Sequence, residues 1–355
     1  MSKFLKECYS TLDAYVPGEQ PKDGEYIKLN TNESPFPPSS GVINAVNSQE
    51  VKKLRLYSDP TGAALKQKIA ALYGVKENNV YLANGSDDIL NFSFMAFSGD
   101  KGSAVYPQIS YGFYKVFAAL YGISAEEIPL KDDFSIDYRD YLNKNKFIVI
   151  ANPNAPTGLC LPLSEIEEII KSNSENVVVI DEAYVDFGGE SAIPLTKKYD
   201  NLLVCQTFSK SRSMAGARLG FAIGNEALIA DLELIKYSTN PYNINRLTLI
   251  AGAAAIDDDE YYRNNCKEII KNREYTVNAL KKLGFRVIDS RANFIFAESD
   301  RIDGETLYKR LKEERILVRH FSTEKIVNFN RITIGTMEQM QQFIKTVEKI
   351  LEEVK

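Results

Sequence analysis

The sequence predicts an α/β protein in which a mainly parallel sheet lies between helices, with a smaller α+β unit towards the C-terminal end. Three observations support this fold class. Short β-branched runs alternate with amphipathic stretches through the middle of the chain, as in strands that are buried on both faces and joined by helices. After about residue 257 the pattern changes to long charged helices and isolated strands. The length of 355 residues also exceeds one typical core.

The first unit contains six recognisable strand candidates. Apolar runs predict strands at 79–83, 103–106, 146–151, 176–180, 201–206 and 219–223. Helices are expected at 88–97 and 111–121. A further helix begins near Ser164, where Ser164 and Glu167 have the spacing of a capping box.

The second unit opens with one long charged amphipathic helix over 261–283. Strands are then expected at 285–288, 294–297, 316–319 and 331–334, and helices at 304–314 and 337–354. The first 45 residues are rich in Pro and Asn and should pack on or beside this unit. The predicted organisation is therefore an N-terminal segment (1–45), a large domain (46–257) and a small domain (258–355).

Composition excludes several classes of function. Hydrophobic residues make up 44% and charged residues 26% of the chain, which is ordinary for a water-soluble globular protein. The net charge is −5, and no run of Lys and Arg could follow a nucleic-acid backbone. No stretch approaches the roughly 20 apolar residues of a membrane span, and the N-terminus does not have the pattern of a signal peptide. We expect a cytoplasmic protein.

The cysteines and the single histidine disfavour a metal site. Cys8, Cys160, Cys205 and Cys266 are far apart and form no CxxC pair. Cys205 lies in an apolar run and should be a reduced core thiol. His320 is the only histidine, so a multi-histidine metal site or a catalytic triad is not expected.

Reactive side chains follow directly after the 201–206 strand. In an open parallel sheet, ligands bind at the carboxyl ends of the strands, so residues at these ends converge on one crevice. A partly desolvated lysine forms an imine with an aldehyde, and hydroxyls with an arginine fork bind phosphate. Taken alone, this lysine could equally be a solvated residue beside a turn. The residues concerned are Thr207, Ser209, Lys210 and Arg218.

Asp181 and Tyr184 follow the 176–180 strand. A buried aspartate needs a cationic partner. A protonated pyridine nitrogen is such a partner, and the carboxylate keeps it protonated so that the ring acts as an electron sink. Tyr184 could reach a phenolic oxygen of the same ring. The alternative is a strand-end aspartate that caps the next helix.

Two further loops lie at strand ends. The turn at 152–158 contains two prolines and a glycine and is therefore stiff. In it Asn154, or Asn152, could donate to the same phenolic oxygen. The other loop opens a helix whose free N–H groups suit a phosphate, through Gly85, Ser86 and Asp87. Taken singly, these loops are a plain turn and an ordinary serine N-cap.

In combination and order, the four loops resemble the fold-type I aminotransferases that use pyridoxal 5'-phosphate (PLP). The details resemble the histidinol-phosphate aminotransferase branch of that class. The resemblance covers nearly the whole chain. It is carried by the segments 15–19, 28–33, 57–60, 84–88, 111–114, 152–158, 181–184, 208–210, 215–220, 241–243, 292–294 and 331–336.

The resemblance implies a large PLP-binding domain with a mainly parallel seven-stranded sheet. Lys210 would hold PLP as a Schiff base and act as general base, with Asp181 and Tyr184 as further catalytic groups. Tyr111 would stack on the pyridine ring. Tyr57 would reach the coenzyme phosphate of the neighbouring subunit, which implies an obligate homodimer with shared sites. The substrate side would be lined by Tyr15, Asn293, Arg319 and Arg331.

Without the resemblance, Tyr57 and Tyr111 would be interpreted as core or interface aromatics. Arg319 and Arg331 would then be surface ion-pair partners.

The reaction implied by the resemblance is a ping-pong transamination between L-histidinol phosphate and 2-oxoglutarate in histidine biosynthesis. An aromatic aminotransferase or a threonine-phosphate decarboxylase would have the same fold. A non-catalytic PLP-binding regulatory protein is the alternative of another class, and the joint presence of Lys210, Asp181 and Arg331 disfavours it. A nicotinamide enzyme is disfavoured because no GxGxxG follows a first strand. Segments 34–38 and 211–214 depart from the family's pattern, which bears on the substrate rather than on the coenzyme.

Overall fold

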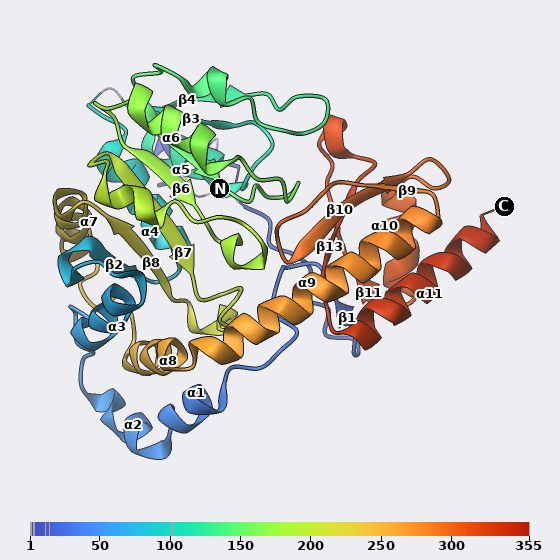
Figure 1. Ribbon diagram of the computed structural model, residues 1–355, viewed down its shortest axis with the longest axis horizontal. Coiled ribbons are helices and arrows are strands. Elements are labelled where there is room, and N and C mark those ends of the chain that lie inside the picture. The colour runs from blue at the N-terminus through green and yellow to red at the C-terminus, as the bar shows by residue number, and fades with distance from the viewer. Residues whose placement is uncertain (1, 3, 11, 14, 101, 355) are drawn as a thin grey trace.

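The computed structural model describes residues 2, 4–10, 12–13, 15–100 and 102–354, which form a large sheet, a small sheet and their covering helices (Figure 1). The large sheet has seven strands in the order β2-β8-β7-β6-β5-β3-β4. Strand β8 is antiparallel to both of its neighbours, and the other pairings are parallel. This confirms the predicted α/β class. The strands are β2 (Val80–Ala83), β3 (Ser103–Pro107), β4 (Ser124–Ile128), β5 (Phe147–Ala151), β6 (Val178–Asp181), β7 (Leu202–Thr207) and β8 (Gly220–Gly224).

Helices cover both faces of the large sheet. Successive strand residues point to opposite faces: in β7, Leu202 and Val204 belong to one core cluster, and Leu203 and Cys205 to the other. The strands are therefore apolar throughout because both of their faces are buried. One face is covered by α3 (Ala63–Tyr73), α6 (Leu163–Ser172) and α8 (Arg246–Asp257), and the other by α4 (Ser86–Phe97), α5 (Phe113–Tyr121) and α7 (Glu226–Thr239).

The small sheet is antiparallel, with the order β12-β13-β10-β9. The long helix α9 (Asp259–Lys282) runs from the end of α8 to this sheet (Figure 1). Helices α9, α10 and α11 bury their apolar faces with the sheet in a separate core. The remaining elements of this unit are β9 (Phe285–Val287), β10 (Phe294–Ser299), α10 (Gly304–Glu313), β12 (Arg319–His320), β13 (Asn330–Thr333) and α11 (Met337–Glu353).

The N-terminal segment packs on the small unit. Strand β1 (Ile27–Lys28) pairs in parallel with β11 (Ile316–Leu317). The backbone N–H of Thr333 then donates to the carbonyl of Leu29 at 2.9 Å. Further along, α1 (Ser40–Ala45) packs on α8 of the large unit. The domain boundaries at residues 45 and 257 stay a prediction.

Three expectations about secondary structure were wrong or incomplete. The capping box at Ser164 is not present: α6 begins after Pro162 without a side-chain cap, and Glu167 instead accepts from Lys198 at 2.6 Å. The strand expected at 316–319 is divided at Val318 between β11 and β12, which belong to two different sheets. Strand β4 was not predicted because it is an edge strand in which only Ile128 is buried.

Cys205 is fully buried in β7 and free, as predicted, and Cys160 and Cys266 are also free. The side chain of Cys8 lies outside the described residues. None of the helices in the described part of the chain is both long and apolar enough to cross a membrane.

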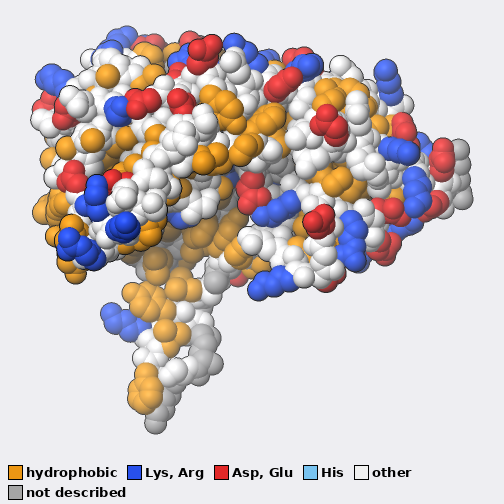
Figure 2. Space-filling model, turned by 90° about the horizontal axis from the view of Figure 1, so that it is seen from below, with side chains coloured by type: hydrophobic (Ala, Val, Ile, Leu, Met, Phe, Trp, Pro, Cys, Tyr) orange, Lys and Arg blue, Asp and Glu red, His pale blue; other side chains and the backbone are white. Residues whose placement is uncertain are grey.

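Large hydrophobic side chains are exposed on α1, α2 (Ser48–Lys52) and the loop that follows. Viewed from below, the side of α1 and α2, the molecule shows hydrophobic side chains between the charged ones (Figure 2). Tyr57 is 79% exposed, and its ring stacks on Tyr242 with centroids 4.5 Å apart. The exposed hydrophobic residues of this region are Ile43, Val51, Leu54, Leu56, Tyr57 and Tyr242.

Candidate active site

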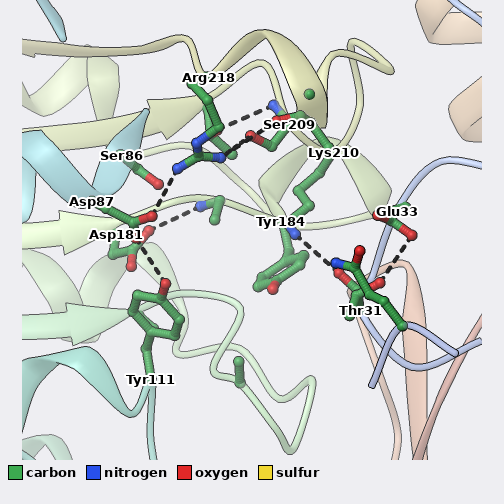
Figure 3. A pocket seen from close by; sticks show the side chains of 17 residues that line it. Thr31, Glu33, Ser86, Asp87, Tyr111, Asp181, Tyr184, Ser209, Lys210 and Arg218 are labelled. Carbon is green, nitrogen blue, oxygen red and sulfur yellow. Dashed lines mark hydrogen bonds and ion pairs between the residues drawn. The ribbon is translucent and has the colours of Figure 1, made fainter. Parts of the chain in front are cut away.

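A cavity of about 370 Å³ opens where β5, β6 and β7 end and helix α4 begins (Figure 3). Ala151, Asp181 and Thr207, each the last residue of its strand, lie in the wall. Residues 30–33, which we call the strap, supply Thr31 and Glu33 to the same wall. The structure therefore brings the predicted strand ends together. The predicted site residues in the wall are Ser86, Asp87, Tyr111, Asp181, Tyr184, Thr207, Ser209, Lys210 and Arg218.

Lys210 lies three residues beyond β7 and extends along the cavity (Figure 3). Its Nζ is 3.4 Å from the carbonyl oxygen of Thr31 and 5.7 Å from the centroid of the Tyr184 ring. Within the described residues, no carboxylate forms an ion pair with Lys210. An amine that lies on a cavity wall without a carboxylate partner is available to attack a carbonyl carbon.

Asp181 is a buried carboxylate, 4% exposed, at the end of β6. Its Oδ2 accepts from the Tyr114 hydroxyl at 2.8 Å, and its Oδ1 accepts from the backbone N–H of Ala183 at 3.2 Å. Burial raises the pKa of Asp181 to about 6, against the lowering effect of these two hydrogen bonds. A buried carboxylate that faces a cavity without a basic side-chain partner suits a ligand with a cationic ring nitrogen.

Hydrogen-bond donors gather at one end of the cavity. Arg218 donates through Nη2 to Asp87 Oδ2 at 2.8 Å and through Nη1 to Ser209 Oγ at 3.4 Å. Tyr111 donates to Asp87 Oδ1 at 2.7 Å. Helix α4 has Gly85 at its N-cap and no side-chain cap, so the first-turn N–H groups are left without a side-chain partner. Arginine, hydroxyl and helix start together are suited to bind a phosphate.

Two glycines permit this close arrangement. A Cβ atom on Gly220 would lie 2.5 Å from the backbone nitrogen of Ser86, and one on Gly85 would lie 2.6 Å from Arg218 Nη2. Gly85 also has φ +85°, a conformation that other residues rarely adopt. Any side chain at either position would push Arg218 or strand β8 away from the start of α4.

Several predicted site residues lie outside the cavity wall. Asn154 is buried, and its amide donates to the Ile109 carbonyl at 3.0 Å and to Thr157 Oγ1 at 3.2 Å. The Asn152 amide bonds the backbone of Leu161. These amides shape the 152–158 turn, in which both prolines follow cis peptide bonds. A contact between either asparagine and a coenzyme stays a prediction.

The two predicted tyrosines take different positions. Tyr15 stacks on Phe113 at 4.4 Å and lies 6.4 Å from the ring of Tyr111, so it is next to the cavity. Tyr57 lies on the exposed surface, and it is absent from this chain's own cavity wall.

Arg319 on β12 and Arg331 on β13 lie directly opposite each other, because these two strands are neighbours in the small sheet. Arg331 donates to the carbonyl of Asn30 at 3.0 Å, and its Nε has no partner within the described residues. Burial lowers the pKa of Arg331. Like charges directly opposite each other on a sheet are unfavourable. In the described chain no carboxylate pairs with either arginine, so the pair is suited to an anionic ligand.

The sequence interpretation missed some of the site. Tyr114 and Asn32 received no role, although both contact predicted site residues. The segment 28–33, which carried the resemblance, contains Thr31, Asn32 and Glu33. It was the signal in the sequence that could have identified them as site residues. The other unpredicted residues in the wall are Gln20, Ala151, Ala155, Ala183, Ala215 and Gly216. Asn293 is fully buried, and its amide donates to the Asn32 carbonyl at 3.0 Å.

Comparison with known proteins agrees with this geometry. Residues 24–347 match the family described as aminotransferase class I and II. The chain is 53% identical to the histidinol-phosphate aminotransferase of Brachyspira hyodysenteriae over 352 residues, 99% of each chain.

Two solved structures share the fold. The histidinol-phosphate aminotransferase of Clostridium acetobutylicum has a TM-score of 0.85 at 26% identity, over 92% of this chain and 99% of that one. The enzyme of Sinorhizobium meliloti in complex with pyridoxal-5'-phosphate has a TM-score of 0.90 at 21% identity, over 100% and 99%. The chain belongs to the class I and II aminotransferases, a PLP-dependent family, and within it to the histidinol-phosphate aminotransferase branch.

Proposed function

We propose that this chain transfers the amino group of L-histidinol phosphate to 2-oxoglutarate, in the cytoplasm, as a step of histidine biosynthesis. The observation that carries the proposal is the pair of opposed arginines, Arg319 and Arg331, which have no carboxylate partner within the described residues. Both substrates of this reaction are anions, one a phosphate ester and the other a carboxylate. The names of the full-length relatives support the same assignment.

The cavity residues fit PLP. The donors of Arg218, Ser209 and the start of α4 suit its phosphate, and the buried Asp181 carboxylate suits its ring nitrogen. Tyr111 lies in the wall beside Asp87 and is held by a hydrogen bond, in a place suited to stacking on the ring. When bound, PLP would supply an aldehyde that reacts with amines and a ring that accepts the electrons of a broken Cα–H bond.

Each residue then has a defined task. The Lys210 amine would hold the coenzyme and, once the amino donor has taken its place, would accept the proton from the substrate Cα. Asp181 keeps a proton on the ring nitrogen. Tyr184, in the wall beside Lys210, donates to the phenolic oxygen of the ring. Arg319 and Arg331 bind the anionic end of each substrate in turn.

The arginine pair gives a test of the substrate. Arg331→Ala should weaken both half-reactions by about 2–5 kcal/mol each, because a buried anion loses a bidentate partner. Arg319→Ala should weaken the half-reaction with the dianionic phosphate more than the half-reactions with glutamate or 2-oxoglutarate. Measuring kcat/KM for each half-reaction separately checks both expectations.

A panel of amino donors with the wild-type protein decides the pathway. We expect histidinol phosphate to have the highest kcat/KM. A preference for phenylalanine or tyrosine would reject the pathway assignment and leave the aminotransferase assignment intact. If the protein instead decarboxylates threonine phosphate, it is a threonine-phosphate decarboxylase, which has the same fold but catalyses a different reaction.

The proposal includes a homodimer with shared sites. Tyr57 is 79% exposed, and it projects from a surface that carries Ile43, Val51, Leu54 and Leu56. Stacking on Tyr242 fixes its ring, and the adjacent Ser58 hydroxyl donates to the Ile244 carbonyl at 2.7 Å. An exposed, rigidly held tyrosine outside its own cavity is suited to reach the coenzyme phosphate of a second subunit.

Subunit mixing tests this arrangement. Lys210→Ala and Tyr57→Phe homodimers should each be impaired, whereas a heterodimer of the two should contain one unimpaired site, because both lesions fall in the other site. The phenylalanine ring of the Tyr57→Phe variant keeps the stacking area, so only the hydroxyl is lost. Activity that rises on subunit exchange is the expected result. A fully active monomer in analytical ultracentrifugation would reject the shared site.

A further inference from the structure

Asn32 connects the small sheet to Tyr184 through its side-chain amide. It is buried in the strap, 1% exposed. Its Nδ2 donates to the Tyr184 hydroxyl at 3.0 Å, and its Oδ1 accepts from the Thr333 hydroxyl at 3.0 Å. The backbone N–H of Asn32 also donates to Thr333 Oγ1 at 3.0 Å. Two hydroxyls and one amide therefore form a continuous chain of hydrogen bonds from β13 to the cavity.

The hydrogen bonds of this chain all run in one direction. Thr333 Oγ1 accepts from the backbone N–H of Asn32 and donates its own proton to Asn32 Oδ1. With Oδ1 engaged in this way, the amide nitrogen faces Tyr184. Because an NH₂ group only donates, the Tyr184 oxygen is an acceptor in this contact. Its own proton has no acceptor within the described residues, and Tyr184 lies in the cavity wall.

The strained backbone conformation of Asn32 indicates that its hydrogen bonds to Thr333 and Tyr184 serve the site. Asn32 has φ +56°, a left-handed conformation that costs a non-glycine residue about 1–2 kcal/mol and is best tolerated by Asn and Asp. Contacts from the small unit hold the strap there: Asn293 donates to the Asn32 carbonyl and Arg331 to the Asn30 carbonyl, both at 3.0 Å. Strain that neighbouring contacts maintain beside a cavity is typical of functional sites.

We propose that Asn32 is a positioning residue that makes the Tyr184 hydroxyl a hydrogen-bond donor to the coenzyme, with Thr333 setting the direction. The proposal rests on the proposed role of Tyr184 in the same site. Asn32 occupies the acceptor side of the Tyr184 oxygen, so the hydroxyl proton is directed to the phenolic oxygen of the ring. That hydrogen bond stabilises the anionic form of the phenolic oxygen. It therefore lowers the pKa of the nitrogen that joins the coenzyme to Lys210, whose titration changes the visible absorption.

Asn32→Asp reverses the hydrogen bond to Tyr184 with almost no change in shape. A carboxylate only accepts, so the Tyr184 proton would be directed to residue 32 and lost to the cavity. Aspartate also tolerates the left-handed backbone. We expect the pH midpoint of the visible absorption of the holoenzyme to rise by about one to two pH units, the effect of one hydrogen bond to a charged oxygen. Tyr184→Phe should raise it by a similar amount.

The double variant Asn32→Asp/Tyr184→Phe separates hydrogen bonding from charge. A new carboxylate near the coenzyme also raises this midpoint by simple electrostatics, with or without Tyr184. If Asn32 acts through Tyr184, Asn32→Asp shifts the midpoint by less in the Tyr184→Phe background than in the wild type, because only the electrostatic part of the shift remains. Additive shifts would reject the proposal, and so would a normal midpoint in Asn32→Asp. A normal midpoint in Tyr184→Phe would instead reject the role of Tyr184 itself.

Thr333→Val is a second, uncharged route to the same result. The hydroxyl that sets the direction of the amide is removed, and both orientations of Asn32 become available. We expect a midpoint between those of the wild type and Tyr184→Phe, in a protein whose thermal unfolding confirms that it is folded. This variant decides the matter if Asn32→Asp does not fold, and an unchanged midpoint in a folded Thr333→Val protein would contradict the proposal.

Discussion

Replacing Lys210 by alanine is expected to abolish the visible absorption of the bound coenzyme and to reduce transamination by at least 10²–10⁴-fold, roughly the contribution of a positioned general base. The loss should exceed that range because the attacking amine disappears with the base. Lys210 has no ion-pair partner within the described residues, so its removal breaks no direct ion pair, although it takes away a positive charge that lowers the pKa of Asp181 and Glu33. The folded structure should therefore persist, and absorbance with single-turnover kinetics measures the effect.

Chemical mapping supplies the control for this expectation. Borohydride reduction of the wild-type holoenzyme should place the pyridoxyl group on Lys210, as found by peptide mass spectrometry. Lys28 is a matched control, because it lies in β1, just before the strap, and is paired with Glu33 at 2.7 Å. A pyridoxyl group on Lys28 or on any other lysine would refute the mechanism.

Asp181→Asn should reduce turnover by about 10²–10³-fold, the scale on which one preorganised electrostatic contact contributes to catalysis. Asparagine keeps the size of the side chain but cannot hold the ring nitrogen in its protonated form. Coenzyme affinity should change much less, because the phosphate contacts of Arg218, Ser209 and α4 are intact. Coenzyme titration by fluorescence and steady-state kinetics separate the two effects.

Tyr114→Phe provides a graded version of the same test. It removes one of the two hydrogen bonds to Asp181, both of which lower the pKa of that carboxyl. Loss of the hydrogen bond from Tyr114 raises the pKa of Asp181, so on acidification the Asp181 carboxylate becomes protonated at a higher pH. We expect about a tenfold loss in kcat and an acid limb of the pH profile displaced to higher pH.

Near-normal turnover in Asp181→Asn would show that another group protonates the ring.

The central strands could be predicted from the sequence because both of their faces are buried. Strands β5, β6 and β7 are apolar at almost every position, and their predicted ends differ from the observed ones by only one or two residues. The edge strand β4 has no such run, since most of its side chains are exposed. The capping box of α6 was wrongly expected, because the N-cap is Pro162 and Ser164 lies inside the helix.

The site was predictable where it depends on strand ends, and not where it depends on distant contacts. Asp181 and Lys210 directly follow recognisable strands, so local pattern and topology place them in one crevice. Tyr114 acts on a residue 67 positions away, and Asn32 contacts Thr333 at a separation of 301. Hydrogen bonds over such separations are a property of the tertiary fold and leave no local pattern in the sequence.

The long-range contacts of the strap have a consequence for synthesis of the chain on the ribosome. Asn32 and its partner Thr333 are 301 residues apart, so at about 5–20 residues per second the strap emerges roughly 15–60 s before its partner does. The large sheet lies wholly between residues 80 and 224 and can be complete by then. Coenzyme-binding groups can thus be assembled first, and the contact between Asn32 and Thr333 that supports the Tyr184 hydrogen bond can form only when translation is nearly finished. A nascent chain that stops before β13 would contain Lys210 and Asp181 in a folded sheet and yet have no completed site.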